Sequence, residues 1–238
     1  MKDKIMRECR IQLPDLLAEL LFPAGAAVLG IGFLAFISWR HPEESYVAIG
    51  SIMAVMMVVV LSLFAGTKKL INEFNRAVAF GQTRRDFLVF HSLIIYVFLL
   101  LELFLIRGWA EIENRIGAAW FSGKMDLDIC SWLRPELLPV YALVLLGIRL
   151  FFMALLIRYM KMATVAILAL WMLFVLGFPN MMDAVSEAPD SLLGVMGRGL
   201  LDILGGIPEK TGIVMLNTVG VLMVGGAVLL LRKQRVTA

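Results

Sequence analysis

The sequence has few of the residues on which catalysis and metal binding depend. It contains two cysteines and two histidines in 238 residues. Cys9 and Cys130 form no C-x-x-C pair, and His41 and His91 stand alone, which argues against a metal or redox site. The sequence also lacks the G-x-x-x-x-G-K-S/T loop of ATP-binding proteins and the G-x-S-x-G and H-E-x-x-H motifs of hydrolases. An intramembrane enzyme is therefore a disfavoured class, and we expect no ATP hydrolysis by this chain alone.

Charge is also scarce, and this scarcity indicates the class of protein. Only 17% of the residues are charged and 61% are hydrophobic, with a mean hydropathy of +0.87. A soluble domain has about a quarter charged residues. This chain needs a bilayer around its apolar side chains. We expect a single transmembrane domain over residues 1–238, because no repeat or low-complexity linker divides the sequence.

Six apolar runs of roughly 20 residues are candidate spans, although the fifth is short and ends at Pro179. Their continuous hydrophobicity, without period-two alternation, indicates helices rather than barrel strands, so the predicted fold is all-α. No small-residue cleavage site follows the first run, and we expect no removable signal peptide. The predicted spans are about 20–39, 46–66, 87–107, 138–157, 163–179 and 213–231.

Lys and Arg are unevenly divided between the two sides of these spans. Fourteen of the 22 lie in the N-terminal segment, in connectors 67–86 and 158–162, and in the C-terminal tail, whereas seven lie in the alternate connectors. Because basic residues concentrate in cytoplasmic segments, both termini are predicted to be cytoplasmic. The pI near 9.0 then reflects topology rather than nucleic-acid binding, and membrane lipid is the expected neighbour.

The connector 67–86 holds five cations between two spans. Its apolar residues recur at helical spacing and predict a short amphipathic helix over 68–80. Gly81 suits the end of that helix, and Thr83 suits the N-cap of the next one. Charge alone allows two interpretations: a loop whose cations fix topology at the lipid headgroups, or a lever that moves both neighbouring spans.

This layout resembles the transmembrane subunit of an ABC-2-type ABC transporter. In that family the cytoplasmic link between spans two and three has an acidic or polar helix, then Gly, one or two small polar residues, and Arg-Arg or Arg-Lys at the start of span three. Glu73, Gly81, Thr83, Arg84 and Arg85 match this pattern. The chain length, the six spans and the long final outer loop also match the family.

The resemblance implies a coupling helix that docks in a groove of a separate cytoplasmic ATPase. It implies two such ATPases, with ATP and Mg bound there and no cofactor in this chain, and a second permease subunit that is identical or related. The implied activity is export of amphipathic, peptide or lipid-like cargo across a prokaryotic plasma membrane. The residues expected to take part in coupling are Glu73, Phe74, Arg76, Phe80, Gly81, Thr83, Arg84 and Arg85.

Three further segments have helical spacing outside the predicted spans. Residues 1–19 are amphipathic and predict an interfacial helix that starts or is interrupted near Pro14. The outer connector 108–137 predicts an amphipathic helix with tryptophans at the interface. The Gly-rich stretch 190–207 predicts one or two re-entrant or surface-lying helices between spans five and six.

Two charges fall inside the predicted spans. Arg149 lies near the middle of span four, and Glu102 lies in the outer third of span three. A charge at that depth is costly without a partner, and the two positions differ in depth by about 8 Å. We expect a Glu102–Arg149 ion pair or a shared polar cavity; the alternative is that Glu102 reaches outward to the interface.

Small residues gather in spans one, two and six. They permit close contact between helices, although glycine is common in membrane helices generally. Three non-enzymatic functions remain open: the permease, a non-transporting scaffold or sensor subunit, and a secondary transporter, which would usually have a larger chain with inverted halves. The small residues are Gly25, Ala26, Gly30, Gly32, Gly50, Ser51, Ala54, Gly220, Gly225 and Gly226.

Overall fold

The structure is a computed structural model that describes residues 2–41, 46–79, 81, 83–121, 125–127, 129–187 and 191–232. Nearly all of these residues are helical, as the continuous apolar runs predict. The elements in chain order are α1 (Lys2–Arg40), β1 (Tyr46–Val47), α2 (Ile49–Leu63), α3 (Ala65–Ala79), α4 (Arg84–Trp120), β2 (Met125–Leu127), α5 (Ile129–Trp132), α6 (Leu138–Met172), the π-helix η1 (Leu173–Gly177), α7 (Phe178–Glu187), α8 (Leu192–Gly205) and α9 (Glu209–Arg232).

The outer surface of the long helices is apolar. Leu21 on α1 is 71% exposed and Leu222 on α9 is 68% exposed, and many other large apolar side chains are exposed with them. Such a surface is unfavourable in water and favourable against lipid tails. The chain is therefore an all-α, multi-pass membrane protein. Among the described residues, five helical stretches are long and apolar enough to cross a bilayer: Leu16–Arg40, Ile49–Ala79, Arg84–Trp120, Leu138–Met172 and Lys210–Leu231.

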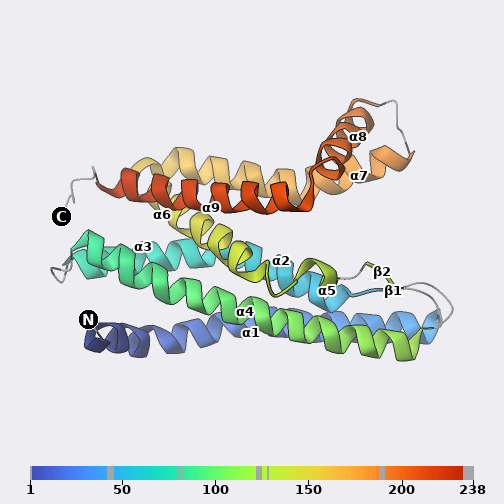
Figure 1. The fold of residues 1–238 in the computed structure, drawn as a ribbon, viewed down its shortest axis with the longest axis horizontal. Coiled ribbons are helices and arrows are strands. Elements are labelled where there is room, and N and C mark those ends of the chain that lie inside the picture. Colours follow the sequence, from blue (N-terminus) through green and yellow to red (C-terminus); the bar gives the residue numbers. More distant parts are fainter. Residues whose placement is uncertain are drawn as a thin grey trace.

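The helices form an elongated bundle in which α1 packs against α2 and α4, and α6 packs against α3, α4 and α9. Figure 1 shows α1 and α4 side by side and running in the same direction. The N-terminal end of α1, the turn between α3 and α4, and the C-terminal end of α9 all lie at one end of the bundle (Figure 1). A core of buried apolar side chains, including Leu99 on α4 and Met153 on α6, joins α2, α3, α4, α6 and α9.

Helix α6 reverses direction within its length. Tyr159 has non-helical torsion angles, φ −134° and ψ 51°, and Figure 1 shows the two arms of α6 folded back on each other. Phe152 from the first arm and Ile167 from the second share one buried cluster. The predicted spans four and five therefore correspond to the two arms of one helical hairpin, and the second arm continues through η1 into α7.

The predicted N-terminal interfacial helix is not a separate element. Helix α1 runs without a break from Lys2 to Arg40 and includes Pro14 and Pro23. Its inner part follows the bundle because Leu16 packs on α4, in a cluster with Ile94 and Phe98. Burial of these apolar side chains favours a straight continuation of α1 over a turn onto the membrane surface.

Helix α4 also continues beyond its predicted end, where we expected a separate helix on the outer leaflet. It extends to Trp120 because Glu113 is fully buried against the start of α2. The Glu113 carboxylate accepts hydrogen bonds from the backbone N–H groups of Gly50 and Ser51, both at 2.7 Å. Ala48 at the N-cap of α2 provides no side-chain cap, so Glu113 satisfies helix donors that would otherwise be unpaired.

Two very short strands, which the all-α prediction did not include, lie at the end of the bundle where Glu113 caps α2. β1 pairs with β2 in parallel, with Tyr46 opposite Met125. Helix α8 confirms one helix in the Gly-rich stretch, and it packs against α7, which begins at Phe178 within the predicted fifth span.

The small residues of spans one and two form a close helix contact, as one interpretation of the sequence predicts. A Cβ added to Gly30 would lie 2.2 Å from the Gly50 Cα, so only glycine permits this approach of α1 to α2. A Cβ added to Gly220 of α9 would lie 3.0 Å from the side chain of Leu143 on α6. Gly25, Gly32 and Gly225 have no atoms within 4 Å of an added Cβ, which fits the alternative that glycine is simply frequent in membrane helices.

We predict that Gly30→Ala destabilises the protein and that Gly32→Ala does not. The first substitution forces α1 away from α2 and should cost about 1–3 kcal/mol, despite the better helix propensity of alanine. The second adds a methyl group to open space on the same helix. Thermal unfolding of the purified protein in one detergent measures the difference, and equal melting temperatures for the two variants would contradict the close contact.

Candidate functional site

Arg149 lies inside the bundle and is held by two other helices. It is only 2% exposed. Its Nε donates a hydrogen bond to Ser62 Oγ on α2 at 3.1 Å, and its Nη1 donates to Glu19 Oε2 on α1 at 3.2 Å. Gly66 allows this position because a Cβ there would lie 3.0 Å from the Arg149 guanidinium carbon. One side chain thus joins α1, α2 and α6 at a depth where an unpaired charge is costly.

Glu19 uses both carboxylate oxygens in this arrangement. One oxygen binds Arg149, and the other lies 3.6 Å from Lys69 Nζ on α3. We call Glu19, Ser62, Lys69 and Arg149 the charge cluster. A buried ion pair stabilises a protein only where further polar contacts satisfy both partners, and Ser62 and Lys69 provide such contacts here.

The predicted Glu102–Arg149 ion pair is not formed. Glu102 on α4 is 1% exposed, and its carboxylate oxygens have no hydrogen-bond partner among the described residues. The two residues also line different cavities. Glu19 takes the place expected for Glu102, because the unbroken α1 carries Glu19 into the bundle instead of leaving it on the membrane surface.

The amphipathic helix predicted over 68–80 exists, but it does not lie apart from span two. Helix α2 ends at Leu63, Phe64 has a distorted conformation with φ −109° and ψ −71°, and α3 begins at Ala65. Figure 1 shows α3 continuing the line of α2 toward one end of the bundle. Its location differs from the prediction because its inner face has partners within the bundle.

Two residues expected to contact an ATPase face this interior. The carboxylate of Glu73 lies 2.7 Å from Nε2 of His91 on α4. Phe74 is buried and makes an edge contact with Phe87, with 5.4 Å between ring centroids, and Phe87 stacks on His91 at 4.1 Å. Glu73 and Phe74 therefore join α3 to α4.

The turn between α3 and α4 has the local geometry that the sequence predicts. Gly81 has φ +79°, and it is the only residue with positive φ in the described part of the chain. Thr83 is the N-cap of α4, and its hydroxyl accepts a hydrogen bond from the backbone N–H of Asp86 at 3.1 Å. We call Arg76 to Asp86 the elbow.

The arginines of the elbow have two different environments. Arg84 is partly buried and donates from Nη1 to the carbonyl oxygen of Leu231 at 3.2 Å, which fixes the elbow to the C-terminal end of α9. Arg76 and Arg85 are exposed and accessible to a partner. Phe80, the remaining predicted coupling residue, lies outside the described residues.

The sequence interpretation missed Glu19, Ser62, Lys69 and His91. Glu19 had a usable signal, because it stands in the apolar run LLAELL and an acid there needs a partner. Lys69 and His91 carried no such signal, since both fall beside polar neighbours at the predicted ends of spans. Ser62 is indistinguishable from an ordinary small residue of a membrane helix.

These contacts attach α3 to the rest of the bundle at several points. Lys69 links α3 to α1, and Glu73 links it to α4. Gly66 of α3 leaves room for the Arg149 guanidinium of α6. Helix α3 is thus joined to α1, α4 and α6 by polar contacts and close packing. The arrangement is suited to transmitting movement.

Comparisons of the chain with models of protein families, with curated proteins and with solved structures find no match. The functional conclusion for this chain therefore comes from its own residues and their geometry.

We predict that Arg149→Met is strongly destabilising and that Glu19→Gln in the same chain recovers much of the loss. The single substitution leaves the buried Glu19 with only the more distant Lys69, and breaking a buried ion pair costs about 3–5 kcal/mol. Arg115→Met is the matched control, because Arg115 is exposed on α4. The test is thermal unfolding of the native protein, the single variants Arg149→Met and Glu19→Gln, the double variant and the control. Strictly additive single-variant losses would contradict the pairing.

Proposed function

We propose that this chain is the permease subunit of an ATP-driven exporter of ABC-2 type. The observation that carries the proposal is the elbow: a sharp, capped turn with exposed cations at one end of the bundle, attached to helices that continue into the apolar region. A loop whose cations only bind headgroups would not need the inward contacts of α3. The geometry therefore favours a connector that moves its neighbouring spans over a loop whose cations only fix the topology.

The proposed mechanism transmits force from a cytoplasmic ATPase to the spans. ATP-driven closure of two ATPase subunits pushes on the exposed side of the elbow, where Arg76 and Arg85 supply positive charge for an acidic partner surface. The push moves α3 and α4 together, because Glu73 and Phe74 join them. Lys69 and Arg149 carry the movement to α1 and α6, which changes the path between this bundle and a second permease subunit.

The assembly has two membrane subunits, identical or related, and two ATPases that bind ATP and Mg. The proposed cargo is an amphipathic, peptide or lipid-like molecule, exported through a prokaryotic plasma membrane. The apolar exterior supports residence in a membrane, and the absence of a phosphate-binding loop from the sequence supports a separate ATPase.

We further propose six crossings with both termini in the cytoplasm. The two arms of α6 support two crossings in place of one, and the common position of the N-terminal end of α1, the elbow and the C-terminal end of α9 supports an even number (Figure 1). The concentration of Lys and Arg at this end supports its cytoplasmic side.

Cysteine accessibility tests this topology in a chain whose own Cys9 and Cys130 are replaced by Ser. We predict that Arg85→Cys and Lys161→Cys react with a membrane-impermeant reagent only from the cytoplasmic side, and that Trp132→Cys reacts only from the outside. All three positions are exposed. Labelling of Lys161→Cys from the outside would contradict the two crossings formed by α6.

A charge reversal tests the coupling. We predict that Arg76→Glu together with Arg85→Glu reduces co-purification with a partner ABC ATPase at least tenfold and removes cargo-stimulated ATP hydrolysis. Both side chains are exposed, so the melting temperature of the variant should remain unchanged.

The matched control is Lys161→Glu, an exposed cation near the reversal of α6 on the same proposed side. It should leave assembly and ATP hydrolysis intact. Full ATPase coupling in the elbow variant would overturn the lever. Assembly with an ATPase that is never stimulated by cargo would favour a scaffold or sensor subunit instead.

A further inference from the structure

A cavity of about 280 Å³ lies between α1 and α4, with α2 at its base. It is larger than the roughly 150 Å³ apolar cavity that is known to hold benzene. Its walls are apolar, formed by residues such as Leu20, Pro23 and Ile106. Leu21 and Leu105 at its edge are more than half exposed, so the cavity opens on the apolar exterior of the bundle.

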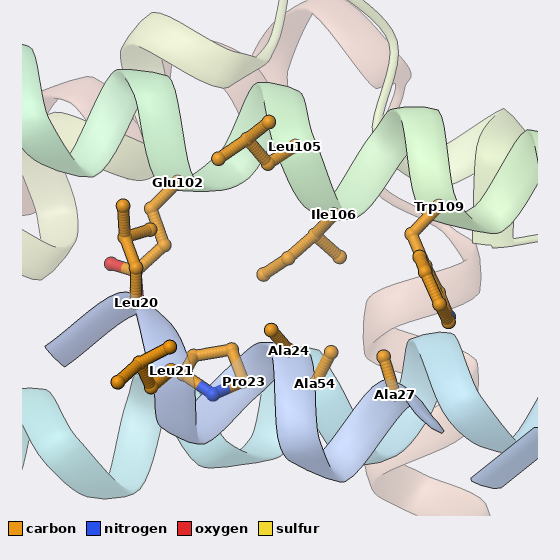
Figure 2. A pocket seen from close by; sticks show the side chains of 10 residues that line it. All are labelled: Leu20, Leu21, Pro23, Ala24, Ala27, Ala54, Glu102, Leu105, Ile106 and Trp109. Atoms are coloured by element: carbon orange, nitrogen blue, oxygen red, sulfur yellow. The ribbon is translucent and has the colours of Figure 1, made fainter. Parts of the chain in front are cut away.

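Two polar groups without hydrogen-bond partners line this apolar cavity. Glu102 contributes both carboxylate oxygens, and Trp109 contributes its indole N–H; within the described residues none of these atoms is paired. Figure 2 shows both side chains directed from α4 toward α1, with Glu102 beside Leu20 and Trp109 beyond Ile106. They are seven positions apart on one helix face, which places them about 10 Å apart along α4.

Among the described residues, no hydrogen bond joins the carboxyl group of Glu102 to a cation. Arg149, the cation expected to pair with it, instead donates to Glu19 and Ser62. Buried polar groups are normally hydrogen-bonded, and a buried carboxylate without a partner is costly. A ligand that brings a positively charged donor would supply the missing partner at this position.

We infer that the cavity binds a lipophilic amine, which enters sideways from the bilayer. Its ammonium group donates to Glu102, its apolar body lies along Leu20, Ala24 and Ile106, and a hydrogen-bond acceptor on it, where present, meets the Trp109 N–H. The carboxylate selects an amine over an alcohol of the same length because a charge-assisted hydrogen bond is roughly twice as strong as a neutral one.

This inference is independent of the proposed transport function. The cavity is formed by helices of this chain alone and needs neither ATP nor an ATPase. The amine is a ligand of this chain whether it is carried or only bound, so binding is measured on the purified chain and its failure leaves the elbow proposal untouched.

The test uses quenching of Trp109 fluorescence by two probes of equal length, an ω-bromoalkylamine and the corresponding ω-bromoalkanol, with the protein in nanodiscs of neutral lipid. We expect saturable quenching by the amine at a concentration at least tenfold lower than that needed with the alcohol. Trp109→Phe should remove this saturable component, which separates the signal of Trp109 from that of the other four tryptophans.

Two variants of the cavity and one control complete the experiment. Glu102→Gln, which keeps the shape of the side chain, should reduce the affinity for the amine to that for the alcohol, and Ala24→Phe should block both probes at the mouth of the cavity. Glu111→Gln removes an exposed carboxylate from the same helix and should change nothing. Melting temperatures confirm that each variant is folded.

Several outcomes would overturn the inference. Equal affinities of the native protein for amine and alcohol would show that Glu102 does not select a cation. A carboxyl group that stays protonated would give this result. Quenching that never saturates, or that survives Ala24→Phe, would show that the probes only dissolve in the lipid.

Discussion

Arg149 carries a positive charge in the buried interior of the bundle, within a helical stretch apolar enough to cross a bilayer, and the fold is organised around its partners. The guanidinium reaches Glu19 on α1 and Ser62 on α2 from its own position on α6. Because each partner comes from a different helix, the three helices are held at one depth and in one rotation about their axes. The absence of a Cβ at Gly66 leaves room for the Arg149 guanidinium, and Lys69 places a second cation beside Glu19.

The same cluster explains why a helix rich in charge lies in line with an apolar span. Lys69 and Glu73 of α3 have partners inside the bundle, on α1 and α4 respectively. The inner face of α3 can therefore be buried, while Arg76 on its outer face is exposed. A helix attached on one side and accessible on the other receives a force and passes it on. This property is what the proposed permease requires of its cytoplasmic end.

The opposite end of the bundle is held by Glu113, which caps the first turn of α2 from α4. Between this cap and the charge cluster, α1 and α4 diverge enough to leave the cavity that contains Glu102 (Figure 2). Three buried acids thus have three different environments: Glu19 is paired with cations, Glu113 caps a helix, and Glu102 has no partner among the described residues. The third is the one open to a ligand.

The sequence by itself determined the membrane class, the helical content and the local chemistry of the elbow, because these depend on composition and on neighbours a few residues apart. Gly81 with its positive φ and Thr83 at the N-cap are such local features, and both are as predicted. Only the tertiary structure decided which acid meets Arg149, since Glu19 and Arg149 are far apart in the chain and the pairing depends on whether α1 bends at Pro14 or continues. The position of α3 in line with α2 was decided in the same way, by partners on α1 and α4 that no local pattern specifies.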